Sequence, residues 1–359
     1  MQPDWTDLQS RTIDWLRFPM AVAVVMLHHS TTLMLDATGP LKSLCIIFQE
    51  GICRLAVPCF FFISGYLFFN RLHSWDWSVW TGKIKSRAKT LLLPYLLWNL
   101  IAFFAYWLFA RAQGQAVSLQ EQFARNGGFS IFWGIGGGIP LGIRAVPIDG
   151  PLWFIRDLIV FTLLTPVIFK VLQWTRIWGA AALAVIFLFV PGYIPEGFVF
   201  YVAGAALQLS GKNILATIWD KRTVLYLSAL ACLAAIYFLA DSPYWGRLAK
   251  YLFIFSGIGA AFCGAATLLA HGKTRVVPFL ANSSFFIFAA HEVLILPEAA
   301  QPLVRAVLPE TGWWRPCLAY FVTPALAVLF CLALLFVLQK VLPRTAALLT
   351  GNRKTRIAY

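Results

Sequence analysis

The chain has 359 residues, of which 60% are hydrophobic and only 12% are charged. A soluble domain carries about 25% charged residues, so the composition excludes an ordinary water-soluble enzyme and is also too apolar for a disordered protein. The seven scattered cysteines are too few for a disulfide-stabilised secreted module. The composition therefore predicts a polytopic membrane protein with an all-α, helical-bundle fold.

Ten runs of mostly apolar residues are candidate membrane spans, because a hydrocarbon layer of about 30 Å needs about 20 helical residues. The expected spans are residues 14–35, 50–70, 90–110, 151–172, 177–191, 195–210, 223–240, 248–270, 277–297 and 317–340. The fifth and sixth are short, and Pro191, Gly192 and Pro195 predict a tight turn that joins them into a helical hairpin. A single bent segment is the alternative.

The net charge of +14 would suggest a nucleic-acid partner in a soluble protein, but in a membrane protein it indicates orientation instead. With the N-terminus inside, the inner segments hold 18 Lys and Arg residues and the outer segments hold 9. The positive-inside rule therefore predicts that both termini are cytoplasmic. No nucleic-acid partner is expected.

One loop, residues 111–150, is long and lies outside in this topology. Its glycine-rich stretch, residues 134–142, is interpreted either as a substrate-facing lid or as a plain connector. The first apolar run continues to Leu35 without a small-residue cleavage site, so we expect no cleaved signal peptide. Residues 1–359 are predicted to form a single membrane domain with no appended soluble domain.

Ionisable side chains are costly inside a membrane and therefore mark candidate functional positions. At about 1.5 Å per residue, His28, Arg156 and His291 are predicted at a similar depth in the outer half of the bilayer. Asp14 and Arg17 share one helix face at the inner mouth, three turns from His28. Because an imidazole accepts a proton near neutral pH, His28 is a candidate general base toward a hydroxyl. A structural hydrogen bond is the alternative role.

The sequence lacks the ligand spacings that are typical of metal sites, because it contains no Cys-x-x-Cys and no two histidines four residues apart. We therefore expect no metal and no permanently bound cofactor.

Five strings of residues resemble, in order, motifs of the integral-membrane acyltransferase family 3. They are Asp14-Trp15-Leu16-Arg17 followed by His28, the run PCFFFISGY at 58–66, the basic tract 83–89 with LLLPY at 91–95, PLWFIRDL at 151–158, and SSFFIF at 283–288 followed by His291. Members of this family transfer acetyl or other short acyl groups, typically from cytoplasmic acyl-CoA, to hydroxyls of envelope carbohydrates or related molecules.

The resemblance implies a set of site residues. Arg17 and His28 are the implied catalytic residues; the acyl-donor site is assigned to Asp14, Ser64, Lys85, Arg87 and Lys89; and the acceptor or oxyanion site is assigned to Trp153, Arg156 and His291. The implied substrates are acetyl-CoA or another acyl-CoA and an envelope carbohydrate or glycolipid, and the implied location is the bacterial inner (plasma) membrane. The basic tract departs from the family pattern, because it is mostly lysine where two arginines are usual.

A secondary transporter or flippase for a polar lipid or sugar is the alternative function, because buried charges also line transport pathways. A transporter of this kind predicts repeat-related halves with interrupted helices at matching positions. The sequence shows no internal repeat.

Overall fold

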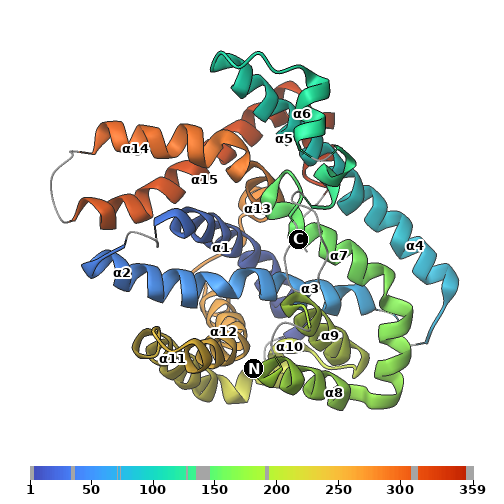
Figure 1. The fold of residues 1–359 in the computed structure, drawn as a ribbon. Coiled ribbons are helices and arrows are strands. Elements are labelled where there is room, and N and C mark those ends of the chain that lie inside the picture. The colour runs from blue at the N-terminus through green and yellow to red at the C-terminus, as the bar shows by residue number, and fades with distance from the viewer. Residues whose placement is uncertain are drawn as a thin grey trace. The chain divides into compact units, whose positions relative to one another are not determined.

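The computed structural model describes residues 4–33, 37–70, 72, 74–126, 128–134, 146–190, 194–308 and 314–352, apart from the side chains of residues 30–33. Within these ranges every regular element is a helix (Figure 1). The all-α fold class predicted from the composition is therefore confirmed.

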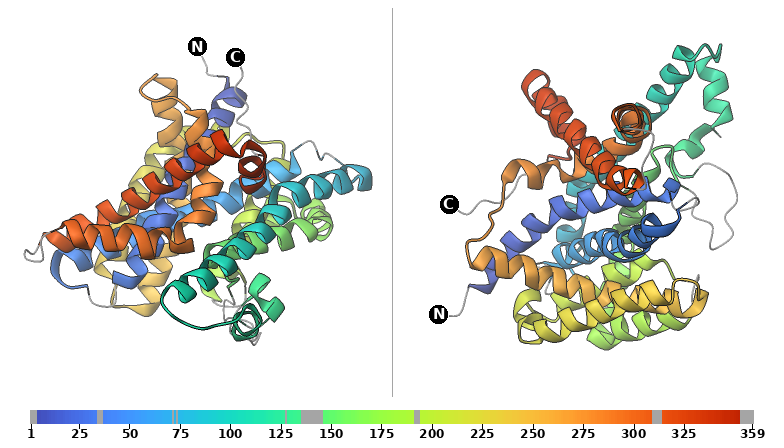
Figure 2. Two further views of the ribbon diagram at one scale, coloured as in Figure 1. Left: turned by 90° about the horizontal axis from the view of Figure 1, so that it is seen from above. Right: turned by 90° about the vertical axis from the view of Figure 1, so that its left-hand side faces the viewer.

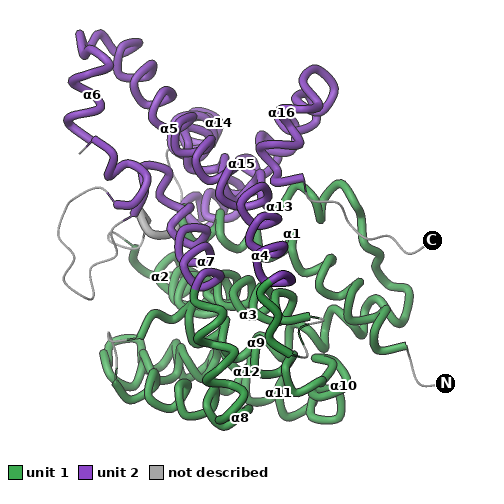
Figure 3. The backbone as a smooth tube through the Cα atoms, turned by 90° about the vertical axis from the view of Figure 1, so that its right-hand side faces the viewer, with its two compact units in different colours: residues 1–77, 164–284, 354–359 green, residues 78–163, 285–353 purple. Residues whose placement is uncertain are grey.

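The chain forms two compact units, each assembled from separate stretches of sequence (Figure 3). Unit 1 comprises residues 1–77, 164–284 and 354–359, and unit 2 comprises residues 78–163 and 285–353. Residues that are distant in sequence therefore meet within each unit.

Unit 1 contains the N-terminal helices and the middle of the chain. Its helices are α1 (Trp5–Leu33), α2 (Gly39–Cys45), η1 (Ile46–Gly51), η2 (Ile52–Leu55), α3 (Ala56–Phe69), α8 (Thr165–Phe189), α9 (Glu196–Leu209), α10 (Ile214–Ile218), η6 (Trp219–Lys221), α11 (Arg222–Phe238), α12 (Pro243–Ala270) and the first part of α13 (Pro278–Ala290). Helices α11 and α12 run side by side (Figure 1, Figure 2).

Two glycines allow α3 and α9 to approach closely in unit 1. A Cβ atom at Gly65 would collide with the backbone carbonyl of Tyr201, and one at Gly204 would collide with that of Phe62. Small residues at such crossings let two helix backbones come together inside a membrane. The glycine of the Ser64-Gly65-Tyr66 string is thus explained by helix packing.

Unit 2 holds the long loop and the C-terminal helices. Its helices are α4 (Trp77–Arg87), η3 (Ala88–Leu92), α5 (Leu93–Ala112), α6 (Leu119–Arg125), η4 (Gly128–Phe132), η5 (Gly150–Leu152), α7 (Trp153–Leu163), the second part of α13, η7 (His291–Ala300), α14 (Gln301–Val307), α15 (Arg315–Val341) and α16 (Pro343–Leu349). The Trp98 Nε1 donates to the Leu349 carbonyl at 3.0 Å and so fastens α16 to α5.

Parts of the long loop pack against α5 and η7 of unit 2. Ile131 and Ile148 are buried in one apolar cluster with Ala102, Phe103 and Val293. The Ile148 N–H also donates to the Ile131 carbonyl at 2.8 Å. The residues before and after the glycine-rich stretch are therefore joined, whereas most of that stretch, from residue 135 onward, lies outside the described residues.

Seven helical segments within the described residues are long and apolar enough to cross a membrane. They are Gly39–Phe69, Trp77–Ala112, Thr165–Phe189, Ile214–Phe238, Pro243–Ala270, Pro278–Val307 and Arg315–Val341. Helix α1 carries many polar residues and is not among them, and α9 has only 14 residues. The chain is therefore a multi-pass membrane protein, while ten spans and the cytoplasmic termini stay predictions.

Two candidate spans have a broken backbone. Helix α8 leaves helical geometry at Arg176, which has φ 53° and ψ −141°, between the predicted fourth and fifth spans. In η7 the break falls at Val293 and Leu294. Helices α8 and α9 pack together, and the hairpin stays a prediction because Pro191 and Gly192 of its turn lie outside the described residues.

Candidate active site

The polar face of α1 carries a close ion pair. The Arg17 Nη1 lies 2.8 Å from the Asp14 Oδ1, one helical turn earlier on the same face. Asp14 is buried and Arg17 is half-buried, so the carboxylate holds the guanidinium in one orientation. The structure thus confirms that the two side chains share a helix face.

This ion pair lines a cavity of about 560 Å³ within unit 1. The lining residues come from α1, the end of α3, and the end of α9 with the loop that follows it: Thr6, Gln9, Ser10, Ile13, Asp14, Arg17, Tyr66, Leu67, Asn70, Gln208, Gly211, Lys212 and Asn213. Two cationic residues, Arg17 and Lys212, and a single carboxylate therefore belong to its wall. The wall carries a net positive charge and otherwise offers neutral hydrogen-bonding groups.

A hydrogen-bond network fixes this wall. The Gln9 Nε2 donates to the Tyr66 hydroxyl at 3.2 Å, and that hydroxyl donates to the Lys212 carbonyl at 3.1 Å. The Ile214 N–H donates to the Gln9 Oε1 at 2.5 Å. One tyrosine therefore ties α3 both to α1 and to the loop after α9, and this holds the backbone of Lys212 in place.

A second, smaller cavity of about 100 Å³ lies beside Asp14 and is also lined by Trp15, Pro19 and Arg275. The Trp15 Nε1 donates to the Thr274 hydroxyl at 3.0 Å. This bond fastens the first turns of α1 to the segment before α13. Asp14 thus borders two cavities, and each of them has an arginine in its wall.

His28 belongs to the same helix, eleven residues beyond Arg17, which is about 16 Å along the axis. Its side chain is half-buried, whereas that of the neighbouring His29 is buried. Ser64 is half-buried on α3 and does not line the 560 Å³ cavity, where its neighbour Tyr66 stands instead. Unit 1 therefore contains the predicted residues Asp14, Arg17, His28 and Ser64.

In unit 2, Arg156 on α7 anchors part of the long loop. Its Nε and Nη2 donate to the Asp157 Oδ1 at 2.9 and 2.8 Å, and its Nη1 donates to the Trp133 carbonyl at 2.6 Å. The guanidinium carbon also lies 5.4 Å from the centre of the Trp133 ring. Arg156 thus joins the start of α7 to residue 133 of the loop. Trp153, the first residue of α7, lies one turn earlier.

His291 stands where α13 ends and the broken helix η7 begins. It is fully buried, and its Nδ1 lies 3.0 Å from the Ile287 carbonyl. Because a carbonyl can only accept, Nδ1–H is the donor in this contact. A break in a membrane helix that bears a buried histidine is a pattern of functional sites.

The predicted donor residues of the basic tract lie on α4 and η3 in unit 2. Lys85 and Lys89 are exposed, while Arg87 is half-buried. The two lysines are four residues apart and therefore lie on the same side of the helix.

Asp149 is a buried carboxyl group that precedes the Pro151–Leu158 string. Its N–H donates to the Asn99 Oδ1 at 3.2 Å, and the Asn99 Nδ2 donates to the Tyr95 carbonyl at 2.8 Å. Neither carboxyl oxygen of Asp149 has a hydrogen-bond partner among the described residues. Burial, together with the negative charge of Glu292, raises the pKa of Asp149 well above its ordinary value. This shift favours the protonated, neutral form of Asp149.

The comparison with known protein families covers the chain from α1 to α15. A family model described as an acyltransferase domain matches residues 11–338. The chain belongs to acyltransferase family 3. It is therefore a membrane acyltransferase that transfers groups other than aminoacyl groups.

The acyltransferase is similar to the succinoglycan biosynthesis protein ExoH of Rhizobium meliloti (strain 1021). The two are 27% identical over 361 residues, which cover 96% of this chain and 92% of ExoH. No solved structure matches the chain.

Sequence reasoning missed four residues of this acyltransferase that the structure brings to notice: Gln9, Tyr66, Lys212 and Asp149. Tyr66 is the last residue of the run PCFFFISGY at 58–66. Its polar hydroxyl at the end of this mostly apolar run was the signal that could have identified it as a site residue. The others gave no signal, because Gln9 and Lys212 meet only through the fold and Asp149 lies in a loop.

Proposed function

We propose that this acyltransferase moves an acetyl or other short acyl group from cytoplasmic acyl-CoA to a hydroxyl of an envelope carbohydrate or glycolipid. The observation that carries the proposal is the Asp14–Arg17 pair on the wall of the 560 Å³ cavity, with Lys212 beside it. His28 lies on the same helix as this pair. One helix of the enzyme thus presents both an anion-binding group and an imidazole.

The donor's phosphate groups need cations, and the wall around Asp14 supplies them. Arg17 can hold a phosphate with two parallel hydrogen bonds, whereas Lys212 acts as a point charge. Arg275 borders the smaller cavity and adds a third cation. Lys85, Arg87 and Lys89 are proposed to support donor binding at the inner surface.

The proposed chemistry is a direct transfer in which His28 handles the proton. His28 removes the proton from the acceptor hydroxyl as its oxygen attacks the thioester carbonyl carbon. The carbon–sulfur bond then breaks, and the CoA sulfur leaves with the proton that His28 took up. The negative charge on the carbonyl oxygen needs a donor group, a role we propose for Arg156 or His291.

A carbohydrate acceptor is supported by the relative, whose name places it in the biosynthesis of succinoglycan. Aromatic side chains are suited to stack on sugar rings, and Trp133 and Trp153 both precede Arg156 in the sequence. Trp133 is held by the Arg156 guanidinium. We propose that Trp153 and the 111–150 loop receive the acceptor on the outer face of a bacterial inner membrane, with both termini in the cytoplasm.

The test uses the purified full chain in nanodiscs, with labelled acetyl-CoA or succinyl-CoA and an envelope polysaccharide. We expect release of free CoA and label on the polysaccharide, with both lost in His28→Ala. His271→Ala is the matched control, because His271 is exposed at the end of α12. Full activity in His28→Ala would remove His28 from the base role. Absence of transfer from every acyl-CoA tested would overturn the donor assignment.

A transporter or flippase is the second candidate, favoured only by the broken helices at Arg176 and at Val293 and Leu294. Movement of an intact glycan across liposomes without any acyl donor would support it. The family membership favours the acyltransferase.

A further inference from the structure

Arg176 has a backbone conformation that is costly for any residue with a side chain. Its φ of 53° and ψ of −141° interrupt α8. A non-glycine residue in such a sparsely populated region costs about 1–3 kcal/mol and persists only where something else stabilises it. A glycine here would relieve the strain, so the presence of arginine calls for an explanation from its side chain.

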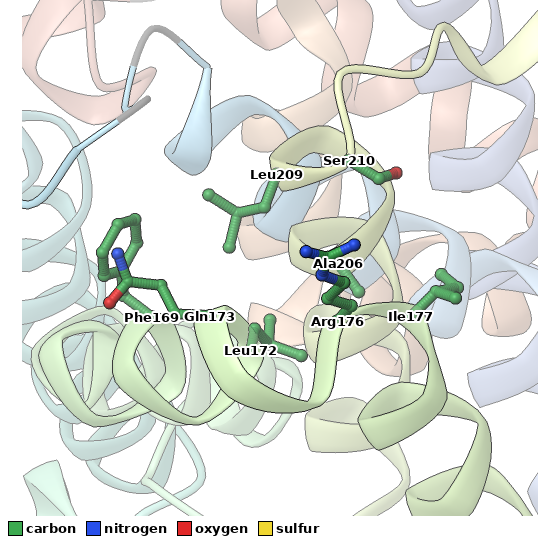
Figure 4. A pocket seen from close by; sticks show the side chains of 8 residues that line it. All are labelled: Phe169, Leu172, Gln173, Arg176, Ile177, Ala206, Leu209 and Ser210. Atoms are coloured by element: carbon green, nitrogen blue, oxygen red, sulfur yellow. The ribbon is translucent and has the colours of Figure 1, made fainter.

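The Arg176 side chain lines a cavity of about 340 Å³ between α8 and α9 in unit 1. The cavity is lined by Phe169, Leu172, Gln173, Arg176, Ile177, Ala206, Leu209 and Ser210. Figure 4 shows Arg176 reaching from α8 toward Ala206 on α9, with Ser210 beyond it. The wall is therefore apolar except for a guanidinium, an amide and a hydroxyl.

Arg176 is exposed, and its guanidinium forms no ion pair within the part of the chain that the structure describes. Among the described residues, no carboxylate or hydrogen-bond acceptor contacts its guanidinium. The other lining residues are neutral. The cavity thus offers the five N–H donors of a planar guanidinium to solvent or to an anionic ligand.

The surroundings of Arg176 indicate a membrane–water interface. Trp174 and Trp178, two residues to either side, are 82% and 78% exposed. Exposed tryptophans gather where the hydrocarbon layer meets the lipid headgroups. The apolar side chains of Val171 and Ile177 are also exposed on α8. A ligand at Arg176 therefore has its polar part at headgroup level and apolar protein surface beside it.

We propose that the Arg176 cavity binds the phosphate of an anionic membrane phospholipid. The guanidinium pairs with the phosphate, and the lipid's acyl chains lie along the exposed apolar surface of α8. A basic pocket between membrane helices is the arrangement that recognises anionic headgroups, and the two tryptophans favour a lipid over a soluble phosphate. The bound lipid offsets the backbone strain at residue 176. This site does not depend on the proposed donor or acceptor.

The test is native mass spectrometry of the detergent-purified full chain titrated with phosphatidylglycerol or phosphatidylcholine. We expect preferential retention of phosphatidylglycerol, and a loss of affinity of about tenfold in Arg176→Gln, the usual effect of removing one charge-assisted contact. Arg222→Gln is the matched control. Arg222 is an arginine at the start of α11 whose guanidinium stacks on Trp219, and its loss should leave retention unchanged.

Three outcomes would overturn the proposal. The first is an equal loss of affinity in Arg176→Gln and Arg222→Gln. The second is equal retention of the two lipids by the wild-type protein. The third is displacement of phosphatidylglycerol by excess inorganic phosphate or acyl-CoA, which would assign the cavity to a soluble anion.

Arg176→Gly separates the role of the side chain from that of the fold. Glycine adopts positive φ without a steric cost, so this variant should unfold at a higher temperature than the wild type in lipid-free detergent. It should nevertheless lose phosphatidylglycerol as Arg176→Gln does. Retention of the lipid by Arg176→Gly would contradict the site.

Discussion

The Arg17 guanidinium and the Asp14 carboxylate lie 2.8 Å apart on one face of α1, at the wall of the 560 Å³ cavity in unit 1. A half-buried arginine held by a single carboxylate keeps donor groups for a further anion, because a guanidinium carries five N–H groups. The pair therefore both orients Arg17 and leaves it able to bind a phosphate.

Arg17→Ala is expected to weaken acyl-CoA binding by tenfold or more, because a charge-assisted hydrogen bond contributes about 1.5–3 kcal/mol. Arg17→Lys should recover part of the affinity, because lysine keeps the positive charge. The recovery should be incomplete, because lysine cannot donate two parallel hydrogen bonds as a guanidinium does. Isothermal titration of the purified chain with a non-hydrolysable acyl-CoA analogue measures both. Arg11→Ala is the matched control, because Arg11 forms an exposed ion pair with Asp7 on the same helix. Unchanged affinity in Arg17→Ala would remove Arg17 from the donor site.

Tyr66→Phe should lower the stability of unit 1 and loosen the donor cavity. The variant removes a hydroxyl that links Gln9 to the Lys212 carbonyl, and each hydrogen bond contributes about 0.5–1.5 kcal/mol. We expect a lower unfolding temperature and a raised KM for the acyl-CoA. The control is Tyr237→Phe, which removes an exposed hydroxyl that bonds Ser43 in the same unit. Equal effects of the two variants would refute a specific role for Tyr66.

Features that depend on neighbouring residues along a helix could be predicted from the sequence. Features that depend on contacts between distant residues mostly could not. Hydropathy predicted an all-helical membrane fold, and the spacing of Asp14 and Arg17 placed them on one face, since three residues is almost one turn. The break at residue 176 falls where the predicted fourth and fifth spans meet. The wall of the cavity could not be predicted in this way, because Tyr66 meets Gln9 and Lys212 across 57 and 146 positions.

Burial was the other property that the sequence did not reveal. Asp149 lies in the long loop, where an aspartate is ordinarily exposed, and its burial depends on Asn99 and on the packing of the loop against α5 and η7. Helix breaks at Val293 and Leu294 were likewise unexpected, because the apolar run continues through them.

Asp149→Asn should change how stability depends on pH. Burial and Glu292 raise the pKa of Asp149 in the folded protein, so folding binds a proton at pH values where the unfolded carboxyl is ionised. The free energy of unfolding therefore falls as the pH rises above the ordinary aspartate pKa of about 3.9, by up to about 1.4 kcal/mol per pH unit. The fall stops above the raised pKa. Asp149→Asn should flatten this slope in thermal unfolding measured across pH.

The control variant for Asp149→Asn is Glu121→Gln, which should change the pH dependence of stability in the opposite direction. Glu121 is exposed, and its hydrogen bonds with Ser118 lower its pKa, so its contribution to stability is present at neutral pH and is lost on acidification. Glu121→Gln should therefore remove a small stabilisation at neutral pH. An unchanged pH profile in Asp149→Asn would show that the carboxyl is not held protonated.

Gly65→Ala should disrupt the contact between α3 and α9. The added Cβ would collide with the Tyr201 carbonyl, which is backbone and cannot rotate away, and overpacking of this kind costs about 1–3 kcal/mol. Because Tyr66 follows directly on α3, the displaced helix should also weaken acyl-CoA binding. Gly82→Ala is the matched control: Gly82 lies in α4 with nothing near its Cβ position, and alanine there should stabilise the helix by about 0.5–1 kcal/mol. Unfolding temperatures in one detergent compare the two, and a Gly65→Ala protein as stable as Gly82→Ala would refute the close helix crossing.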